Sequence, residues 1–124
     1  MTVTYLRRGP TGGRTLVLMH GIGGGAETFA PQLEGLSDSF DVVAWNMPGY
    51  GGSRLEGAMT FAGLADALAG LLDALGADKA DLLGHSIGGM VAQEFVATRP
   101  DRVRSLVLSG TTAAFGSKDG SFQE

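Results

Sequence analysis

The sequence predicts an α/β fold with a mostly parallel, twisted sheet and helices on both of its faces. Short apolar runs such as residues 16–19 alternate along the chain with amphipathic runs at helical spacing, which is typical of parallel strands joined by crossover helices. The apolar runs are continuous, as expected for strands covered on both faces. Glycine clusters at residues 21–25, 49–52 and 84–89, between the expected elements, which indicates constrained loops.

In the first half of the chain, one helix is expected between two buried strands. Residues 2–6 alternate enough for an antiparallel strand, and residues 9–13 carry the glycines and proline of a turn. The continuous apolar runs at 16–19 and 41–45 predict buried strands. Between them, residues 28–36 place their apolar side chains on one face of a helix.

In the second half, the clearest helix of the chain precedes two further strands. Apolar residues recur at helical spacing over residues 61–75, and Gly76 follows as a helix-ending glycine. A strand is then expected at 80–84, a helix at 86–98 and a last strand at 103–108. The polar, glycine-containing remainder predicts no further element.

Length and composition fit a single domain over residues 1–124. Hydrophobic residues make up 44% of the 124 positions and charged residues 18%, which allows a sizeable core. No apolar run is long enough for a membrane span, and no apolar segment follows Arg7 and Arg8 as in a signal peptide. The absence of cysteine excludes disulfides and fits a reducing compartment. We therefore expect a cytoplasmic protein with no membrane partner.

The charge pattern argues against a nucleic-acid partner. The formal net charge is −4 at pH 7, whereas nucleic-acid surfaces are basic. Apart from Arg7 and Arg8, the clustered basic residues are the trio Arg99, Arg102 and Arg104, which we interpret as a solvated rim near a helix end.

The segment Gly84-His85-Ser86-Ile87-Gly88 is a G-x-S-x-G placed between an expected strand and an expected helix. A sharp strand-to-helix turn exposes its middle residue at the edge of the sheet. Glycines at 84 and 88 allow strand and helix to pass close to each other. Serine is a weak nucleophile until a base takes its proton. We therefore predict that Ser86 is the nucleophile of an acyl-transfer hydrolase.

The loop His20-Gly21-Ile22-Gly23-Gly24-Gly25 follows a buried strand and predicts an oxyanion site. Two backbone N–H donors are needed for the tetrahedral intermediate, and removing one typically costs ~10²–10³ in rate. We assign these donors to Ile22 and Ile87. Gly21, Gly23 and His85 are the expected substrate-binding positions in the same two loops. The alternative is a tight turn that merely requires glycine.

Other kinds of site fit the sequence less well. Gly21-x-Gly23-x-x-Ala26 matches a dinucleotide fingerprint, but the next strand ends in Trp45-Asn46, where an acid would bind the ribose. No phosphate-cradling P-loop motif occurs. The chain's two histidines, His20 and His85, lack a third metal ligand. We expect no cofactor and no metal, and we interpret both histidines as structural, since neither is placed to act as a general base.

Three segments together resemble the α/β-hydrolase superfamily in order and spacing, over essentially the whole chain. They are His20-Gly21, the loop at residues 48–53 and Gly84-His85-Ser86-Ile87-Gly88-Gly89. The segment at residues 29–33 and the tail at 108–116 look most like the 3-oxoadipate enol-lactonase-type branch. The resemblance implies attack on a carboxylic ester or lactone carbonyl through an acyl-enzyme, without a cofactor. Carboxylesterases, C–C bond hydrolases and haloperoxidase-like enzymes share the same motifs.

The resemblance also implies an acid and then a histidine after the nucleophile. No histidine follows Ser86, and we do not assign Asp119, in the polar tail, as the catalytic acid. We therefore expect an N-terminal half that ends after about the sixth strand of the family's sheet, with little activity by itself. Residues 103–108 would form an apolar edge open to a complementing chain or an oligomer partner. Two alternatives stay open: a non-catalytic module that binds a small ligand or such a chain, and a nucleotide-binding domain.

Overall fold

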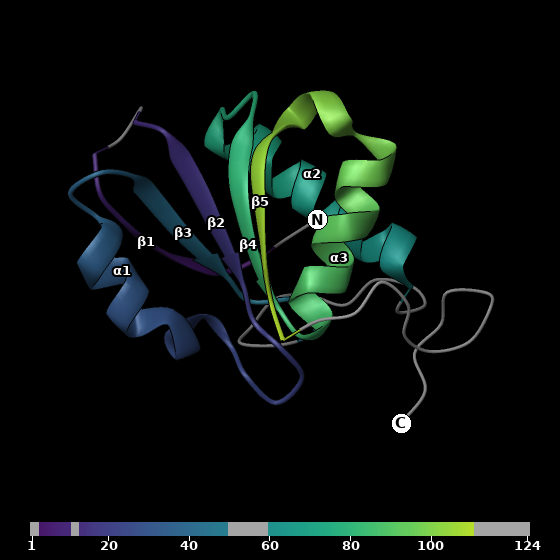
Figure 1. The fold of residues 1–124 in the computed structure, drawn as a ribbon, viewed down its shortest axis with the longest axis horizontal. Helices are drawn as coiled ribbons and strands as arrows, with labels where there is room; N and C mark the ends of the chain where they lie inside the picture. The colour runs from purple at the N-terminus through teal and green to yellow at the C-terminus, as the bar shows by residue number, and fades with distance from the viewer. Residues whose placement is uncertain (1–2, 11–12, 50–59, 111–124) are drawn as a thin grey trace.

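A five-stranded sheet lies at the centre of the protein, between layers of helices (Figure 1). The computed structural model describes residues 3–10, 13–49 and 60–110. In these residues the strand order is β1-β3-β2-β4-β5, and every neighbouring pair is parallel except β1 and β3. The strands are β1 Tyr5–Arg8, β2 Thr15–Met19, β3 Asp41–Trp45, β4 Ala80–His85 and β5 Val103–Ser109.

Helices cover both faces of the sheet, as the sequence predicts. One face packs against α1, and the other packs against α2 and α3. The helical segments are η1 Ala26–Phe29, α1 Ala30–Leu36, α2 Phe61–Leu75, α3 Ile87–Thr98 and η2 Pro100–Arg102. The predicted α/β fold class is thus confirmed.

The two cores explain why the central strands read as continuous apolar runs. In β2, Leu16 and Leu18 belong to the core beside α1, whereas Val17 and Met19 belong to the core beside α2 and α3. All five residues of β2 and all five of β3 are buried. A strand covered on both faces has no polar face, so its sequence does not alternate.

The bounds predicted for α2 are confirmed. The hydroxyl of Thr60 accepts a hydrogen bond from the N–H of Gly63 over 3.0 Å, which caps the start of the helix. At the other end, Gly76 adopts a left-handed φ of 72°, which permits a helix-ending turn. In the described residues, no helix has both the length and the apolar character needed to cross a membrane.

The expected strand at residues 2–6 is wrong by several positions. The strand is Tyr5–Arg8, and it pairs with β3 so that Tyr5 lies opposite Trp45. Arg7 fixes this register through two hydrogen bonds to Asp41, of 2.9 Å and 2.7 Å. All four residues of β1 are exposed, so no buried face marks the strand in the sequence.

Two helix starts also differ from expectation. The segment expected as one helix at 28–36 consists of the 3-10 turn η1 followed by α1, with Pro31 in the first turn of α1, where a missing N–H is tolerated. The helix expected at 86–98 is α3, and it starts at Ile87, one residue after the expected start, because Ser86 has a non-helical conformation.

The last strand forms one edge of the described sheet. β5 pairs with β4 on one side, and its Val107 and Leu108 side chains are 53% and 42% exposed. The expected apolar edge at residues 103–108 is therefore present in the described sheet.

Candidate active site

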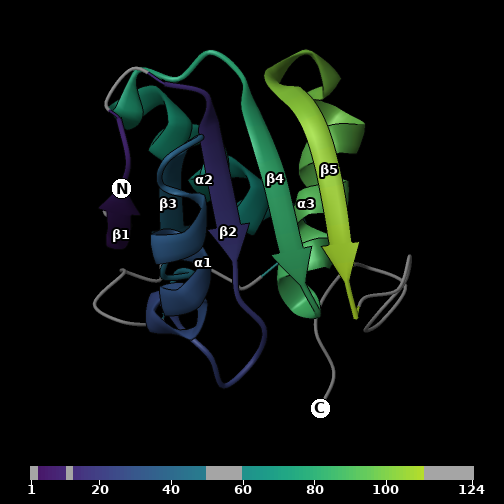
Figure 2. The ribbon, with the colours of Figure 1, turned by 60° about the vertical axis from the view of Figure 1, so that its left-hand side comes forward.

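The candidate site lies where the direction of the chain across the sheet changes. From β2 the chain moves to β3 on one side, and it then returns to β4 on the other side of β2. In α/β sheets, ligands bind in the crevice outside the carboxyl ends of strands at such a switch point. Figure 2 shows β2 and β4 side by side with their ends at the same edge. The loop that starts at His20 follows β2, and Ser86 follows β4.

Ser86 occupies a strained corner between β4 and α3. Its backbone has φ 55° and ψ −120°, and it is the one non-glycine residue with a positive φ in the part of the chain described. Such conformations typically cost ~1–3 kcal/mol and persist only where neighbours enforce them. Here, the N–H of Ser86 donates to the carbonyl of Ser109 over 2.9 Å, and its own carbonyl accepts from Gly89 over 3.0 Å.

The glycines on either side of Ser86 allow very close backbone contacts. A Cβ added to Gly84 would lie 2.4 Å from the Cα of Gly89. A Cβ added to Gly88 would lie 2.3 Å from the carbonyl oxygen of Met19. These contacts press α3 against β4 and the end of β2, and they enforce the corner at Ser86. The predicted close passage of strand and helix is therefore present.

The loop after β2 lies directly against this corner. A Cβ added to Gly21 would stand 3.0 Å from the Cβ of Ser86. The N–H of Gly24 donates to the carbonyl of Gly21 over 3.1 Å, and Gly23 has φ 83°. A φ of this kind at the third residue of a turn requires glycine in most proteins. The loop is thus a tight glycine turn that places Gly21 against Ser86, with Ile22 next in the chain.

The side chain of His20 contacts the first residue of this turn. Its side chain is fully buried. Nε2 accepts a hydrogen bond from the N–H of Met47 over 3.0 Å, and Nδ1 lies 2.8 Å from the carbonyl oxygen of Gly21. Because a neutral imidazole has one donor and one acceptor, the contact with Met47 assigns the proton to Nδ1. His20 therefore has a structural role, as expected.

The orientation of one peptide plane follows from this contact. The carbonyl of Gly21 and the N–H of Ile22 belong to the same planar, trans peptide unit, so they point in opposite directions. With the carbonyl directed at His20, the N–H of Ile22 is directed away from the imidazole. This N–H forms no hydrogen bond to another residue in the described ranges.

The second predicted donor, Ile87, is the first residue of α3 and is 2% exposed. The first N–H groups of a helix have no partner within the helix. The Ile87 N–H therefore requires a partner from outside α3, and it lies one residue beyond Ser86. A carbonyl oxygen bound above Ser86 would supply an acceptor.

His85 borders the same loop from the other side. A Cβ added to Gly21 would stand 3.5 Å from Cδ2 of His85, and a Cβ added to Gly110 would stand 3.3 Å from Cε1. The exposed imidazole thus lies between these two glycines, at the edge of the sheet that carries Ser86.

Asn46 is a contributor that sequence reasoning overlooked. It is 8% exposed, and its Oδ1 accepts from the N–H of Ala26 over 2.8 Å while its Nδ2 donates to the Thr4 hydroxyl over 2.9 Å. The side chain anchors the end of the glycine loop to β3 and the N-terminal segment. A polar residue directly after a buried strand was the available signal. An amide at this position supplies no carboxylate for a ribose, which argues against the nucleotide-binding alternative.

Some of the predicted features fall outside the described residues. The loop at 48–53 is described only to Gly49, and the tail at 108–116 only to Gly110. Within the described residues, the structure brings Gly21 against Ser86 at one edge of the sheet, with Ile22 and Ile87 as the residues that follow them in the chain. Asp119 also lies outside the described ranges.

Comparison with known proteins shows the family of the chain. Residues 14–123 match the family described as "alpha/beta hydrolase fold". Among curated proteins, the chain is 39% identical over 108 residues to the dihydrolipoyllysine-residue acetyltransferase component of the acetoin cleaving system of Cupriavidus necator, covering 86% of this chain and 28% of that protein.

Solved structures of hydrolases share the fold. A thermophilic esterase from Thermogutta terrifontis is 34% identical with a TM-score of 0.86, over 94% of this chain and 43% of its own. The enol-lactonase from Burkholderia xenovorans LB400 is 28% identical with a TM-score of 0.86, over 94% of this chain and 46% of its own. The chain thus spans less than half the length of each of these relatives.

Proposed function

The chain belongs to the α/β-hydrolase family, and we propose that it carries the nucleophile and oxyanion site of a serine hydrolase acting on a carboxylic ester or lactone. The observation that carries this proposal is the corner at Ser86, where a positive φ in a non-glycine residue coincides with close contact to the loop of Ile22. Strain of this kind is concentrated at functional sites. Esterase and enol-lactonase neighbours support the substrate class.

In the proposed reaction, Oγ of Ser86 attacks the carbonyl carbon as a base removes its proton. The carbonyl oxygen becomes an oxyanion, which the N–H groups of Ile22 and Ile87 stabilise. Collapse of this intermediate breaks the bond to the leaving oxygen, which takes up the proton, and an acyl-enzyme remains. Water, activated by the same base, then hydrolyses the acyl-enzyme and releases Ser86. Gly21, Gly23 and His85 would border the bound acyl group.

The base in this scheme is not one of the chain's two histidines. Both ring nitrogens of His20 are engaged, one with the carbonyl of Gly21 and the other with the N–H of Met47. His85 directly precedes Ser86 in the chain, and its ring lies between Gly21 and Gly110. We propose that a histidine and an orienting acid from a complementing segment or chain complete the site. Turnover by these 124 residues alone should then be far below that of a complete site, with at most a residual ~10³-fold over the reaction in water from the oxyanion site.

A fluorophosphonate probe tests the proposal, because it forms a covalent bond to activated serines. We expect slow labelling at Ser86, located by mass analysis of the modified peptide, and its loss in Ser86→Ala. Ser39→Ala, at an exposed serine, is the matched control and should label like the wild type. Labelling spread equally over Ser39 and Ser86 would contradict an organised site.

A second candidate is a non-catalytic module that binds a small ligand or a complementing chain. The observation in its favour is the exposed apolar edge at Val107 and Leu108. A folded wild-type protein that never labels at Ser86, even after long incubation with the probe, would favour this candidate.

A further inference from the structure

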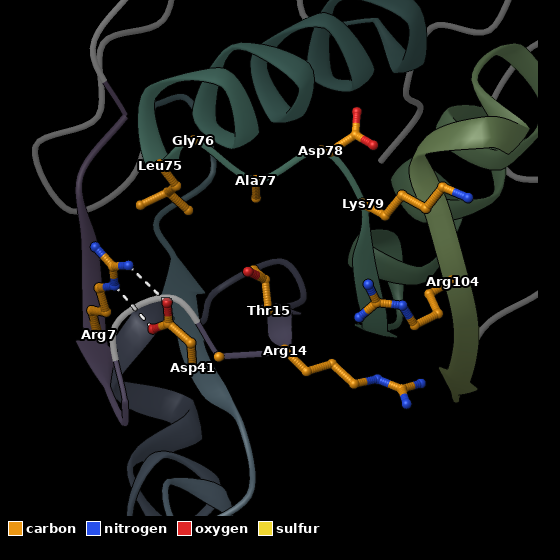
Figure 3. Close-up of a pocket in the computed structure, with 11 residues that line it drawn as sticks. Arg7, Arg14, Thr15, Asp41, Leu75, Gly76, Ala77, Asp78, Lys79 and Arg104 are labelled. Carbon is orange, nitrogen blue, oxygen red and sulfur yellow. Dashed lines mark hydrogen bonds and ion pairs between the residues drawn. The ribbon is translucent and has the colours of Figure 1, made fainter.

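A polar cavity lies at the opposite edge of the sheet from Ser86 (Figure 3). Its volume is about 360 Å³, and it is formed where the strands begin and where the loop from α2 enters β4. The residues that line it are Arg7, Gly13, Arg14, Thr15, Asp41, Leu75, Gly76, Ala77, Asp78, Lys79 and Arg104. Thr15 starts β2, whereas the loop that begins at His20 follows the other end of β2. The cavity is therefore separate from the candidate active site.

Two ion pairs account for the buried carboxylates around this cavity. Asp41 is 2% exposed and receives both hydrogen bonds of Arg7. Asp81 is 4% exposed and accepts from Arg14 over 2.5 Å and 2.9 Å, and from the hydroxyl of Ser105 over 2.5 Å. Both acids are therefore satisfied by neighbours within the protein. These pairs need no ligand.

The remaining charges leave an excess of positive charge at one end of the cavity. Four cationic side chains (Arg7, Arg14, Lys79 and Arg104) stand against three carboxylates (Asp41, Asp78 and Asp81). Lys79 and Arg104 form no ion pair within the described residues. The pKa of Asp81 is lowered, first by its hydrogen bond from Arg14 and to a smaller degree by the charge of Arg104. One carboxylate thus faces two guanidinium groups.

Of the two cations without an ion pair in the described residues, Arg104 is directed into the cavity. Figure 3 shows Arg104 extending from β5 toward the middle of the cavity, on the side of Arg14, whereas the side chain of Lys79 extends away from the other labelled side chains. Thr15, only 9% exposed, also lines the cavity. Its hydroxyl forms no hydrogen bond to any described residue. A hydroxyl that lines a cavity can donate one hydrogen bond to a bound oxygen atom.

We propose that this cavity binds a small anion through a phosphate or carboxylate group, held by Arg104 and the Thr15 hydroxyl, with Arg14 and Lys79 contributing charge. A guanidinium offers several donors in a plane that matches two oxygens of such a group. The volume accommodates a metabolite-sized molecule, which places this site among ordinary ligand cavities. The site is independent of the chemistry proposed for Ser86.

Titration at low ionic strength tests this site directly. Inorganic phosphate and succinate are added separately to the folded 124-residue chain, and backbone amide resonances are followed by NMR. We expect saturable shifts at Thr15, Gly76 and Ala77, with Gly21 and Ser86 unaffected. Tighter binding of phosphate would identify a phosphate-bearing ligand, and tighter binding of succinate a carboxylate. Shifts that centre on Gly21 and Ser86 would overturn the proposal, as would no saturation by either anion.

Matched variants separate a specific site from general electrostatic attraction. Arg104→Gln should weaken anion binding by about tenfold, the effect of losing one charged hydrogen-bond donor. Arg8→Gln removes the same charge from an exposed residue that does not line the cavity, and it should bind as the wild type does. Equal weakening in both variants would overturn the proposal. Thr15→Val keeps the charge and a β-branched side chain on β2, and it should weaken binding severalfold even if Arg104→Gln fails to fold.

Discussion

The N–H of Met47 donates to Nε2 of His20 over 3.0 Å, and this contact links the ends of β2 and β3. The same imidazole holds the carbonyl of Gly21 through Nδ1 at 2.8 Å. One buried side chain therefore contacts two backbone groups at the carboxyl end of the sheet: the N–H of Met47 and the carbonyl of Gly21, which also accepts from the N–H of Gly24. The orientation of the proposed oxyanion donor at Ile22 depends on this link.

Replacing His20 by phenylalanine should destabilise the protein by about 1–3 kcal/mol, because it leaves the N–H of Met47 without its buried acceptor. The free energy of unfolding in urea measures this loss. His85→Phe makes the same chemical change at an exposed position and should change stability by no more than ~0.5 kcal/mol. Equal losses in both variants would show that the contacts of His20 contribute nothing specific.

Gly88→Ala should be among the most damaging single substitutions in the chain. Its Cβ would lie 2.3 Å from the carbonyl oxygen of Met19, and backbone cannot yield as a flexible side chain does. We expect a loss of more than ~3 kcal/mol or a failure to fold, measured by thermal or chemical unfolding.

Gly70→Ala is the control for this substitution. Gly70 lies in α2, and an added Cβ would meet nothing within 4 Å. Alanine should therefore stabilise the helix by roughly 0.5–1 kcal/mol. A stable Gly88→Ala protein would show that α3 can move away from β2, and that the corner at Ser86 is less constrained than its contacts imply.

Elements buried on a clear face could be predicted from the sequence, and exposed ones could not. The strand at 41–45 and the helix at 61–75 have the bounds expected from their apolar patterns. β1 was misplaced because all four of its residues are exposed, and its register depends on the contact of Arg7 with Asp41, 34 positions away. Local patterns carry no information on such distant pairs.

For the site, the sequence indicated which residues meet but not what holds them. Gly84 and Gly88 around Ser86 predicted the corner, because a Cβ at either glycine would clash with the backbone of the neighbouring element. The contacts of His20 with Met47 and of Asn46 with Ala26 span 27 and 20 positions, so they could not be inferred from spacing. The catalytic roles of Ser86, Ile22 and Ile87 stay predictions.

The ion pair between Asp81 and Arg14 should make stability depend on acidity. The pKa of Asp81 is lowered in the folded protein, chiefly by Arg14, while the unfolded chain should titrate near ~3.9. The contribution of Asp81 to the free energy of unfolding is therefore fully present above the unfolded pKa, and it is lost as the pH falls through the lowered pKa of the folded protein. Unfolding free energies between about pH 7 and about pH 2 should show a fall at the acid end that is shallower in Asp81→Asn.

Asp66→Asn is the control for this acid dependence. Asp66 pairs with Arg99 at 2.6 Å, but its side chain is 64% exposed, and such surface pairs contribute little. The acid-end slope of Asp66→Asn should match that of the wild type. Identical slopes in all three proteins would show that Asp81 does not control the acid dependence.

Ser86→Gly should stabilise the protein while removing the proposed nucleophile. A positive φ of 55° strains any residue with a Cβ, and glycine relieves this strain. Part of the gain is offset because glycine makes the unfolded chain more flexible. We therefore expect a net gain of about 1 kcal/mol relative to Ser86→Ala, which also lacks the hydroxyl but keeps the Cβ. The comparison of the two variants separates backbone strain from loss of the hydroxyl. Fluorophosphonate labelling should be lost in Ser86→Gly and in Ser86→Ala. Equal free energies of unfolding for the two variants would mean that the corner is unstrained.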